Sequence, residues 1–326
     1  MKLLYNIRDL LRSRIRRLLE RSYHSMVRPR TKPTEMDAEC VRCGCRLAYI
    51  IDSPVTPDFE LSRLPDDMCS AFTDHRDAIC ANCGLYHAYR RFNDAQIDMM
   101  NGIGKDALTT DEVYHSYPVP EEFIDSWYGN SVERQRNSWL PFVAEIGLVP
   151  NRVLVMRYWL GRQLPMLRDA FDAEFYGVDI SPICTRHVAE HYPYVHQLDG
   201  AINGAFSGPF LDEPPFDLVI VQHVLVHSND VTESIAQLRH LVRDGGLVIV
   251  SAETKVAPTN PFHKFYPTEY QTVSLLADSF DEVYKLDESG PMDPKLLHRY
   301  TGRAVEFAGR VYPENRARKG RMTRHE

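Results

Sequence analysis

The chain has 326 residues, of which 44% are hydrophobic and 25% charged, and these values are ordinary for a globular protein. No apolar run approaches the roughly 18–20 residues that span a bilayer, and arginines interrupt every apolar stretch near the N-terminus, which argues against a secretory signal. The net charge of −7 combines two basic ends with an acidic body, and this distribution argues against nucleic-acid binding. We therefore expect a cytoplasmic protein with one α/β domain and a smaller module.

Residues 1–37 are predicted to form a basic amphipathic helix followed by a linker. Within residues 2–22 the apolar side chains recur at helical spacing, and the arginines lie mostly off that stripe. Such a helix can dock on a protein partner, lie at the surface of a membrane, or pack on its own domain, and the sequence leaves these alternatives open. A second basic segment, residues 313–326, ends the chain.

Residues 38–90 form a short, cysteine-rich segment. Six of the seven cysteines fall between Cys40 and Cys83, and four of them form two Cys-x-x-Cys-Gly turns, at Cys40 with Cys43 and at Cys80 with Cys83. Each such turn directs two thiolates at one ion, and four thiolates satisfy tetrahedral zinc without leaving an open position. We therefore predict a structural zinc site at these four cysteines. The alternative is a metal-free loop of thiols. Further ligand types are present at Cys45, Cys69, His75 and His87.

A helical connector is expected over 91–150, with a helix near 131–147, and an α/β domain over 151–312. Apolar runs at 153–156, 175–180, 216–222 and 247–253 alternate with helical segments. This alternation predicts a doubly wound, mainly parallel sheet, and the fully apolar runs are typical of strands buried on both faces. Weaker patterns predict a helix near 268–278 and strands near 280–286 and 302–308. The helix over 230–243 is expected to end at Asp244-Gly245-Gly246.

The segments CVRCGC and CANCGLYHAYRRF resemble the zinc-binding domain that precedes class I S-adenosylmethionine-dependent methyltransferases, including sugar C-methyltransferases. The later segments YGVDISP, PFDLVIVQHVLVHSND and LRHLVRDGGLVIVSAE resemble the second, fourth and fifth strands of the methyltransferase domain itself. The resemblance covers residues 40–90 and 130–285. It implies a Rossmann-like fold and S-adenosylmethionine as the cofactor.

The same resemblance implies the cofactor-binding residues. Asp179 matches the acidic residue that accepts hydrogen bonds from both ribose hydroxyls, and a carboxylate has the two acceptors that this requires. Asp199 matches the acidic residue that meets the adenine amino group. Gln222 and His223 border the place where sulfonium and acceptor meet, and His223 is the candidate base. Two other interpretations stay open, because Asp179 can cap a helix and His223 can be a hydrogen-bonded residue at a strand end.

The loop after the first strand departs from the family pattern. The family has an acidic residue followed by three spaced glycines, and here those positions hold Val155, Arg157, Trp159 and Gly161. Only Gly161 is retained, and bulky side chains at the other two glycine positions should block or reshape the cofactor pocket. The acid/base stretch of the sugar-methylating subgroup is also absent, since His263-Lys264-Phe265 stands in its place.

Three functions therefore remain open from the sequence. The first is a methyltransferase that acts on a small or glycan-linked substrate through an unusual cofactor loop. The second is a pseudoenzyme, a methyltransferase-like scaffold or regulatory subunit with a structural zinc site. The third is a nucleic-acid-directed role through the zinc module and the two basic ends, against which the acidic body argues. The altered loop favours the second function, whereas Asp179 and Asp199 favour the first.

Overall fold

The computed structural model describes residues 34–35, 39–40, 42–51, 77–88, 132, 135–180, 182–200, 206–228, 230–253, 265–267, 269–286 and 304–311. The predicted helix over 2–22 and the basic tail 313–326 lie outside these residues, as does most of the predicted connector over 91–150. None of the helices in this described part of the chain combines the length and apolar character that crossing a membrane requires.

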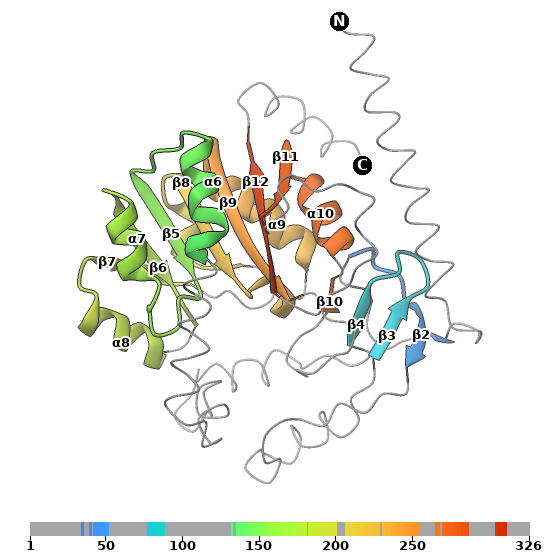
Figure 1. Ribbon diagram of the computed structural model, residues 1–326. Coiled ribbons are helices and arrows are strands. Elements are labelled where there is room, and N and C mark those ends of the chain that lie inside the picture. The colour runs from blue at the N-terminus through green and yellow to red at the C-terminus, as the bar shows by residue number, and fades with distance from the viewer. Residues whose placement is uncertain are drawn as a thin grey trace, which may run out of the picture.

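A mainly parallel sheet of seven strands forms the centre of the protein (Figure 1). In spatial order its strands are β11 (Glu282–Lys285), β12 (Ala304–Arg310), β9 (Val242–Glu253), β8 (Phe216–Gln222), β5 (Arg152–Met156), β6 (Glu174–Val178) and β7 (Val195–Gln197). The five strands from β9 to β7 are parallel, and β12 runs antiparallel to both of its neighbours. From β5 the chain adds β6 and then β7 towards one edge of the sheet. It then returns to the other side of β5, where it adds β8 and then β9. This order confirms the predicted Rossmann-like, doubly wound fold.

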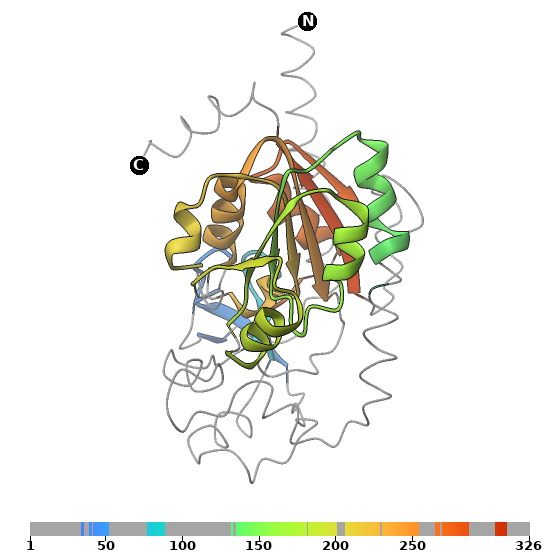
Figure 2. The same cartoon turned by 90° about the vertical axis from the view of Figure 1, so that its left-hand side faces the viewer.

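Helices cover both faces of this sheet, as the edge-on view in Figure 2 shows. One face packs against α6 (Trp139–Glu145), α7 (Leu164–Ala170) and α8 (Pro182–His191), and the other against α9 (Val231–Leu241) and α10 (Glu269–Ala277). Two short 3₁₀ helices, η2 (Pro209–Asp212) and η3 (Leu225–His227), flank strand β8. Successive residues of β5 alternate between the two cores, and all of them from Val153 to Met156 are buried. Burial on both faces explains why these strands read as continuous apolar runs.

The predicted strand over 216–222 coincides with β8, but β9 begins earlier than predicted. Helix α9 ends at Leu241 and the strand starts at Val242, so the segment Asp244-Gly245-Gly246 lies inside β9 and does not terminate the helix. The pairing of β9 with β8 shifts register between Phe216 and Leu218. A Cβ at Gly246 would come within 2.8 Å of the Asp217 carbonyl oxygen, so the glycine permits a close approach of the two strands.

A smaller antiparallel sheet carries the cysteines. Its strands are β1 (Thr34–Glu35), β2 (Leu47–Ile51), β3 (Asp77–Cys80), β4 (Tyr86–Ala88) and β10 (Phe265–Tyr266), in that spatial order. Strand β10 comes from the chain between β9 and α10, so the methyltransferase-like segment supplies the edge strand of the cysteine-rich sheet. Figure 1 shows β10 beside β4 and near α10.

One buried carboxylate joins three strands at the N-terminal edge of the large sheet. Asp217 Oδ2 accepts the backbone N–H of Asn151 and of Arg152, each at 2.8 Å, and its Oδ1 pairs with Arg243 at the start of β9. Burial alone would raise the pKa of Asp217, but the Arg243 side chain and the two backbone donors lower the pKa overall. The ionised form is therefore the one that the fold stabilises.

We expect Asp217→Asn to lower the free energy of unfolding by about 1–3 kcal/mol at pH 7, because two buried N–H groups lose a charged acceptor. The Arg243 side chain is 44% exposed, so the ion pair itself contributes little of this loss. Because the folded pKa is lowered, the contribution is present above the unfolded pKa of about 4 and is lost as the pH falls through the folded pKa.

Urea unfolding of wild type and variant at pH 7 and at pH 3 measures this difference, which should shrink at the lower pH. Glu213→Gln is the matched control, since Glu213 pairs with Arg152 at 3.0 Å but keeps 30% of its side chain exposed. That change should cost less than about 1 kcal/mol. An equal loss in the two variants would contradict the role given to Asp217.

Candidate functional site

The two cysteine turns have the same backbone hydrogen bonds. The amide of Gly44 donates to the Cys40 carbonyl at 2.9 Å, and the amide of Gly84 donates to the Cys80 carbonyl at 3.0 Å. Both glycines have positive φ, 67° and 70°, a conformation that is strained for any residue with a Cβ. The glycine that follows each pair of cysteines therefore allows the tight turn that the sequence predicted.

These turns bring four thiols together. The Sγ atoms of Cys40 and Cys83 lie 3.5 Å apart, those of Cys43 and Cys80 lie 3.6 Å apart, and all four lie within 4.8 Å of one another. Four sulfurs placed tetrahedrally about 2.3 Å from a zinc ion would be roughly 3.8 Å apart. The cluster fits a metal ion of this size, and Cys45, whose Sγ accepts the Leu47 amide at 3.4 Å, lies outside it. The other ligand types singled out in the sequence, Cys69 and His75, are not among the described residues.

Contact between the four thiols raises the pKa of some of them and lowers the pKa of others. The interaction with Cys40 is the largest cause that raises the pKa of Cys80 and of Cys83, and it lowers the pKa of Cys43. Without a cation, four sulfurs at this spacing cannot all ionise, because like charges at contact distance repel. A bound divalent cation removes that restriction, which is the electrostatic reason for such a cluster to take a metal.

The two cysteine turns are anchored on the α/β domain. Arg42, inside the first turn, donates to Ser274 Oγ at 3.0 Å, and Gln271 Nε2 donates to the Gly84 carbonyl at 3.0 Å. Both partners lie on α10. Cys40 and Cys80 belong to the same buried core as Leu276 of that helix. The cysteine cluster and α10 therefore form one packed unit.

A second candidate site lies where the winding of the large sheet reverses. Strands β5 and β8 are neighbours there, and ligands of doubly wound sheets bind in the crevice outside the carboxyl ends of such strands. The loop 157–163 follows β5, and Gln222 with His223 follows β8. The residues implied by the family resemblance therefore meet at the edge where the topology predicts a ligand.

The loop keeps a glycine-type backbone at all three positions of the family pattern. Arg157, Trp159 and Gly161 have φ values of 56°, 54° and 70°. A Cβ at Gly161 would approach the side chains of Leu164 and Tyr192 to 2.7 and 2.8 Å, so this position also lacks space for a side chain. Arg157 and Trp159 therefore occupy left-handed conformations that normally favour glycine.

Arg157 crosses the crevice from β5 to the segment after β8. Its side chain is buried, with 8% of the residue exposed. Nη1 donates to the His223 carbonyl at 2.7 Å and also contacts Nε2 of His227. The guanidinium carbon lies 5.1 Å from the centre of the Trp159 ring. Arg157 therefore links the end of β5 to the segment that follows β8.

Tyr158 fills the space next to β6. Its ring lies over Gly177, where a Cβ would come within 2.5 Å, and its hydroxyl bonds to Gln197 at the end of β7 and to Thr185 on α8. Burial is the main cause that raises the pKa of Tyr158, so the hydroxyl stays protonated and donates. No pattern in the sequence identified Tyr158 or Gln197, because their contact depends on the packing of β6 against β7.

The predicted cofactor residues lie at the ends of successive strands. Asp179 follows β6, and its Oδ2 accepts the backbone N–H of Trp159 at 3.0 Å, so it contacts the loop directly. Asp199 lies two residues after β7 with an exposed side chain, and its carbonyl accepts the amide of Phe210 at 3.3 Å. The Gln222 side chain donates to Gln163, which forms a second polar bridge from β8 to the loop and was not predicted.

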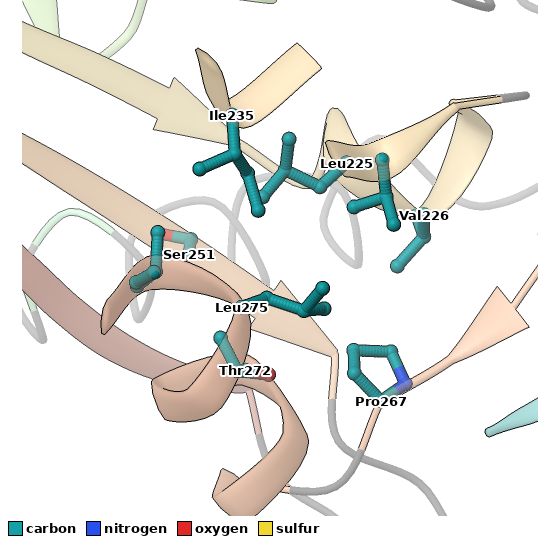
Figure 3. A pocket seen from close by; sticks show the side chains of 9 residues that line it. Leu225, Val226, Ile235, Ser251, Pro267, Thr272 and Leu275 are labelled. Carbon is teal, nitrogen blue, oxygen red and sulfur yellow. The ribbon is translucent and has the colours of Figure 1, made fainter. Parts of the chain in front are cut away.

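His223 has a φ of 50°, and its amide donates to the carbonyl of Ser251 on β9 at 3.1 Å. Next to this contact lies a small apolar pocket, shown in Figure 3, between η3, α9 and α10. It is lined by Leu225, Val226, Val231, Ile235, Ser251, Pro267, Thr272, Leu275 and Leu276. Ser251 therefore both lines this pocket and accepts the backbone N–H of His223.

Comparison with known proteins gives a family for this part of the chain. Residues 160–250 match the family described as a methyltransferase domain. The match begins at Leu160, directly after Arg157 and Trp159, the two positions where the loop departs from the glycine pattern. No curated protein matches the sequence.

Several solved methyltransferase structures are similar in part. An O-methyltransferase family protein from Burkholderia thailandensis is 14% identical, with 61% of this chain and 62% of that one covered and a TM-score of 0.42. The 1,6-didemethyltoxoflavin-N1-methyltransferase from the same organism is 15% identical, with 73% and 96% covered and a TM-score of 0.46. The N-methyltransferase NodS from Bradyrhizobium japonicum is 11% identical, with 56% and 98% covered and a TM-score of 0.40.

The chain spans less than two thirds of the first of these structures. The family match covers the segment that runs from the loop after β5 into β9. Residues 160–250 therefore match a methyltransferase domain, and the strand order of the sheet is that of the Rossmann-like type.

Proposed function

We propose that the protein binds S-adenosylmethionine in the crevice outside the carboxyl ends of β5, β6 and β8, and methylates a small or glycan-linked acceptor. The observation that carries this proposal is the backbone of the loop after β5. Three residues keep the left-handed conformation of the family glycines, although two of them carry large side chains. A loop that had lost its ligand would gain stability by relaxing this strain.

The residues at this edge fit the cofactor. Asp179 lies against the loop and would meet the ribose, and Asp199 has an exposed carboxylate for the adenine amino group. The side-chain nitrogens of Gln163 and Gln197 are buried without a hydrogen-bond acceptor among the described residues, which leaves donors for a ligand. The cofactor, when bound, supplies an electrophilic methyl group.

The chain's own residues would bind and orient the acceptor. Methyl transfer requires alignment of the nucleophile, and it requires a base only where the nucleophile is poorly acidic. His223, at the end of β8, is the candidate for that base. The resemblance of the cysteine module to that of sugar methyltransferases supports a glycan-linked acceptor.

An inactive scaffold is the second candidate, and one observation favours it. The Arg157 side chain closes the crevice by contacts to His223 and His227, where family members have a glycine without a side chain. In that case the module and the basic segment 2–22, for which we propose a role in contacting a protein partner or a membrane surface, would carry the function. Binding of the cofactor separates the two candidates.

We propose that zinc is the metal at Cys40, Cys43, Cys80 and Cys83 and that its role is structural. Purified, reduced protein should contain about one zinc per chain. Cys83→Ser should release it with cooperative loss of the module, because metal binding and folding are coupled. Cys45→Ser, outside the cluster, is the matched control and should leave the metal content unchanged. Elemental analysis of fresh protein without zinc would refute the assignment.

Asp179→Ala should weaken binding of S-adenosylmethionine about 30- to 150-fold, because hydrogen bonds to a charged acceptor are worth roughly 2–3 kcal/mol. Calorimetric titration of wild type and variant measures this loss. Asp169→Ala removes an equivalent charge from the exposed face of α7 and should leave the affinity unaltered. Unchanged binding in Asp179→Ala would place the cofactor elsewhere, and no binding to wild type would favour the scaffold.

The stability of two loop variants tests whether Arg157 supports the fold or only obstructs the crevice. Arg157→Gly and Trp159→Gly relieve the same backbone strain, and both remove the contact between guanidinium and indole. Arg157→Gly also loses the contacts to His223 and His227, and Trp159→Gly also loses the burial of its half-buried indole. We expect Arg157→Gly to be less stable than wild type by about 1–3 kcal/mol in urea unfolding, because two partly buried acceptors lose their donor. Equal stability, with improved cofactor binding in Arg157→Gly, would identify Arg157 as an obstruction.

A further inference from the structure

We propose that Arg157 is an anion-binding residue, and that the ligand of the crevice places a carboxylate or phosphate against its guanidinium. The inference rests on the proposed function only in placing a ligand at this edge of the sheet. It assigns a role to a residue that the family pattern does not contain, since the corresponding family position is a glycine.

The first step is the charge of the site. Arg157 is 8% exposed, and its contacts within the described chain are a carbonyl oxygen, an imidazole nitrogen and an indole ring. A guanidinium can only donate, so Nε2 of His227 accepts and that imidazole is neutral. All three partners are uncharged. The structure thus holds a buried cation without a counter-charge, which is costly unless an anion joins it.

Other arginines of the domain provide the contrast. Arg152 pairs with Glu213, Arg239 with Asp244, and Arg243 with Asp217. These three arginines lie away from the crevice, on strands β5 and β9 and on α9, and each has a carboxylate within the chain. Arg157, at the ligand-binding edge, is buried, and it forms no ion pair with a carboxylate among the residues that the structure describes.

The second step concerns the carboxylate next to the loop. Asp179 Oδ2 accepts the backbone N–H of Trp159 at 3.0 Å, and no ion pair joins this carboxylate to Arg157 among the described residues. A ligand that brings an anion would supply the counter-charge that this carboxylate does not provide.

The third step is the position. Arg157 directly follows β5, at the point where the winding of the sheet reverses and where ligands approach the backbone most closely. An oxyanion at this point can bond the guanidinium through two parallel N–H groups. Two sources fit this chemistry: the carboxylate on the amino-acid part of the cofactor, or an acidic group on the acceptor.

The experiment uses the full chain and a matched pair of ligands. S-adenosylhomocysteine and its decarboxylated analogue, S-adenosyl-3-thiopropylamine, differ only in the carboxylate. Both are titrated by calorimetry into wild type, Arg157→Gln and Arg157→Lys, with Arg168→Gln as the control. Arg168 is an exposed arginine of α7 that lies 4.4 Å from the Tyr194 ring, so its loss removes the same charge away from the crevice.

If the cofactor supplies the anion, wild type should prefer the carboxylate-bearing ligand by about 10- to 100-fold. Arg157→Gln should remove the preference, and Arg157→Lys should keep part of it. If the acceptor supplies the anion, the two ligands should bind equally, and inorganic phosphate should bind to the protein saturated with S-adenosylhomocysteine in wild type and not in Arg157→Gln. Thermal unfolding of every variant verifies that it is folded.

The proposal is overturned if wild type shows neither the preference between the ligands nor phosphate binding that depends on Arg157. Failure of the proposed function has a different signature, because then neither adenosyl ligand binds to wild type at all. Phosphate titration of the ligand-free protein still tests the anion site in that case, since it requires no cofactor.

Discussion

The turn that joins β5 to α7 determines how the carboxyl edge of the sheet is built. Seven residues separate Met156 from Leu164, and within them the backbone takes left-handed conformations at Arg157, Trp159 and Gly161. This path brings the amide of Trp159 to Asp179, which directly follows β6, and places the Arg157 side chain against the segment after β8. Three neighbouring strands are therefore tied together through one loop, and the geometry of the candidate site follows from it.

The central parallel strands could be predicted from the sequence, because strands that are buried on both faces consist of continuous apolar residues. The apolar run at 216–222 coincides with β8, all but one of whose residues are buried. The start of β9 at Val242 could not be predicted, because it depends on a register shift against Phe216 and Leu218 on the neighbouring strand. A strand that contains Gly245 and Gly246 has no local pattern that distinguishes it from the end of a helix.

Of the candidate site too, one part could be predicted from the sequence and another part could not. The resemblance placed Asp179 at the end of β6, and the paired Cys-x-x-Cys-Gly turns predicted the cysteine cluster, because these features are local in sequence. The bridges from Arg157 to His223 and from Gln222 to Gln163 join residues 66 and 59 positions apart. Only the adjacency of β5 and β8 brings these partners together, and neither side chain type indicates its partner.

The cysteine cluster and the crevice are connected through α10. Gln271 holds the second cysteine turn, and Thr272 and Leu275 on the same helix line the apolar pocket next to His223. Strand β10 adds a further link, since it pairs with β4 and precedes Pro267 of that pocket. The helix that forms one wall of the pocket therefore rests on the cysteine turns, and a metal bound there, as proposed, would also support that wall.

The loop after β5 distinguishes an active enzyme from a scaffold. A left-handed conformation costs a residue with a Cβ about 1 kcal/mol, and such strain persists only where the surroundings hold it. The Asp179 bond and the contacts of Arg157 hold it here, and they do so by burying a cation beside uncharged partners. Neither the backbone strain nor the buried charge benefits a scaffold. In a site that binds an anion, the bound ligand offsets the cost of burying the Arg157 charge. If the proposed anion site is correct, the unusual residues of the loop reflect an altered ligand specificity and not the decay of a cofactor site.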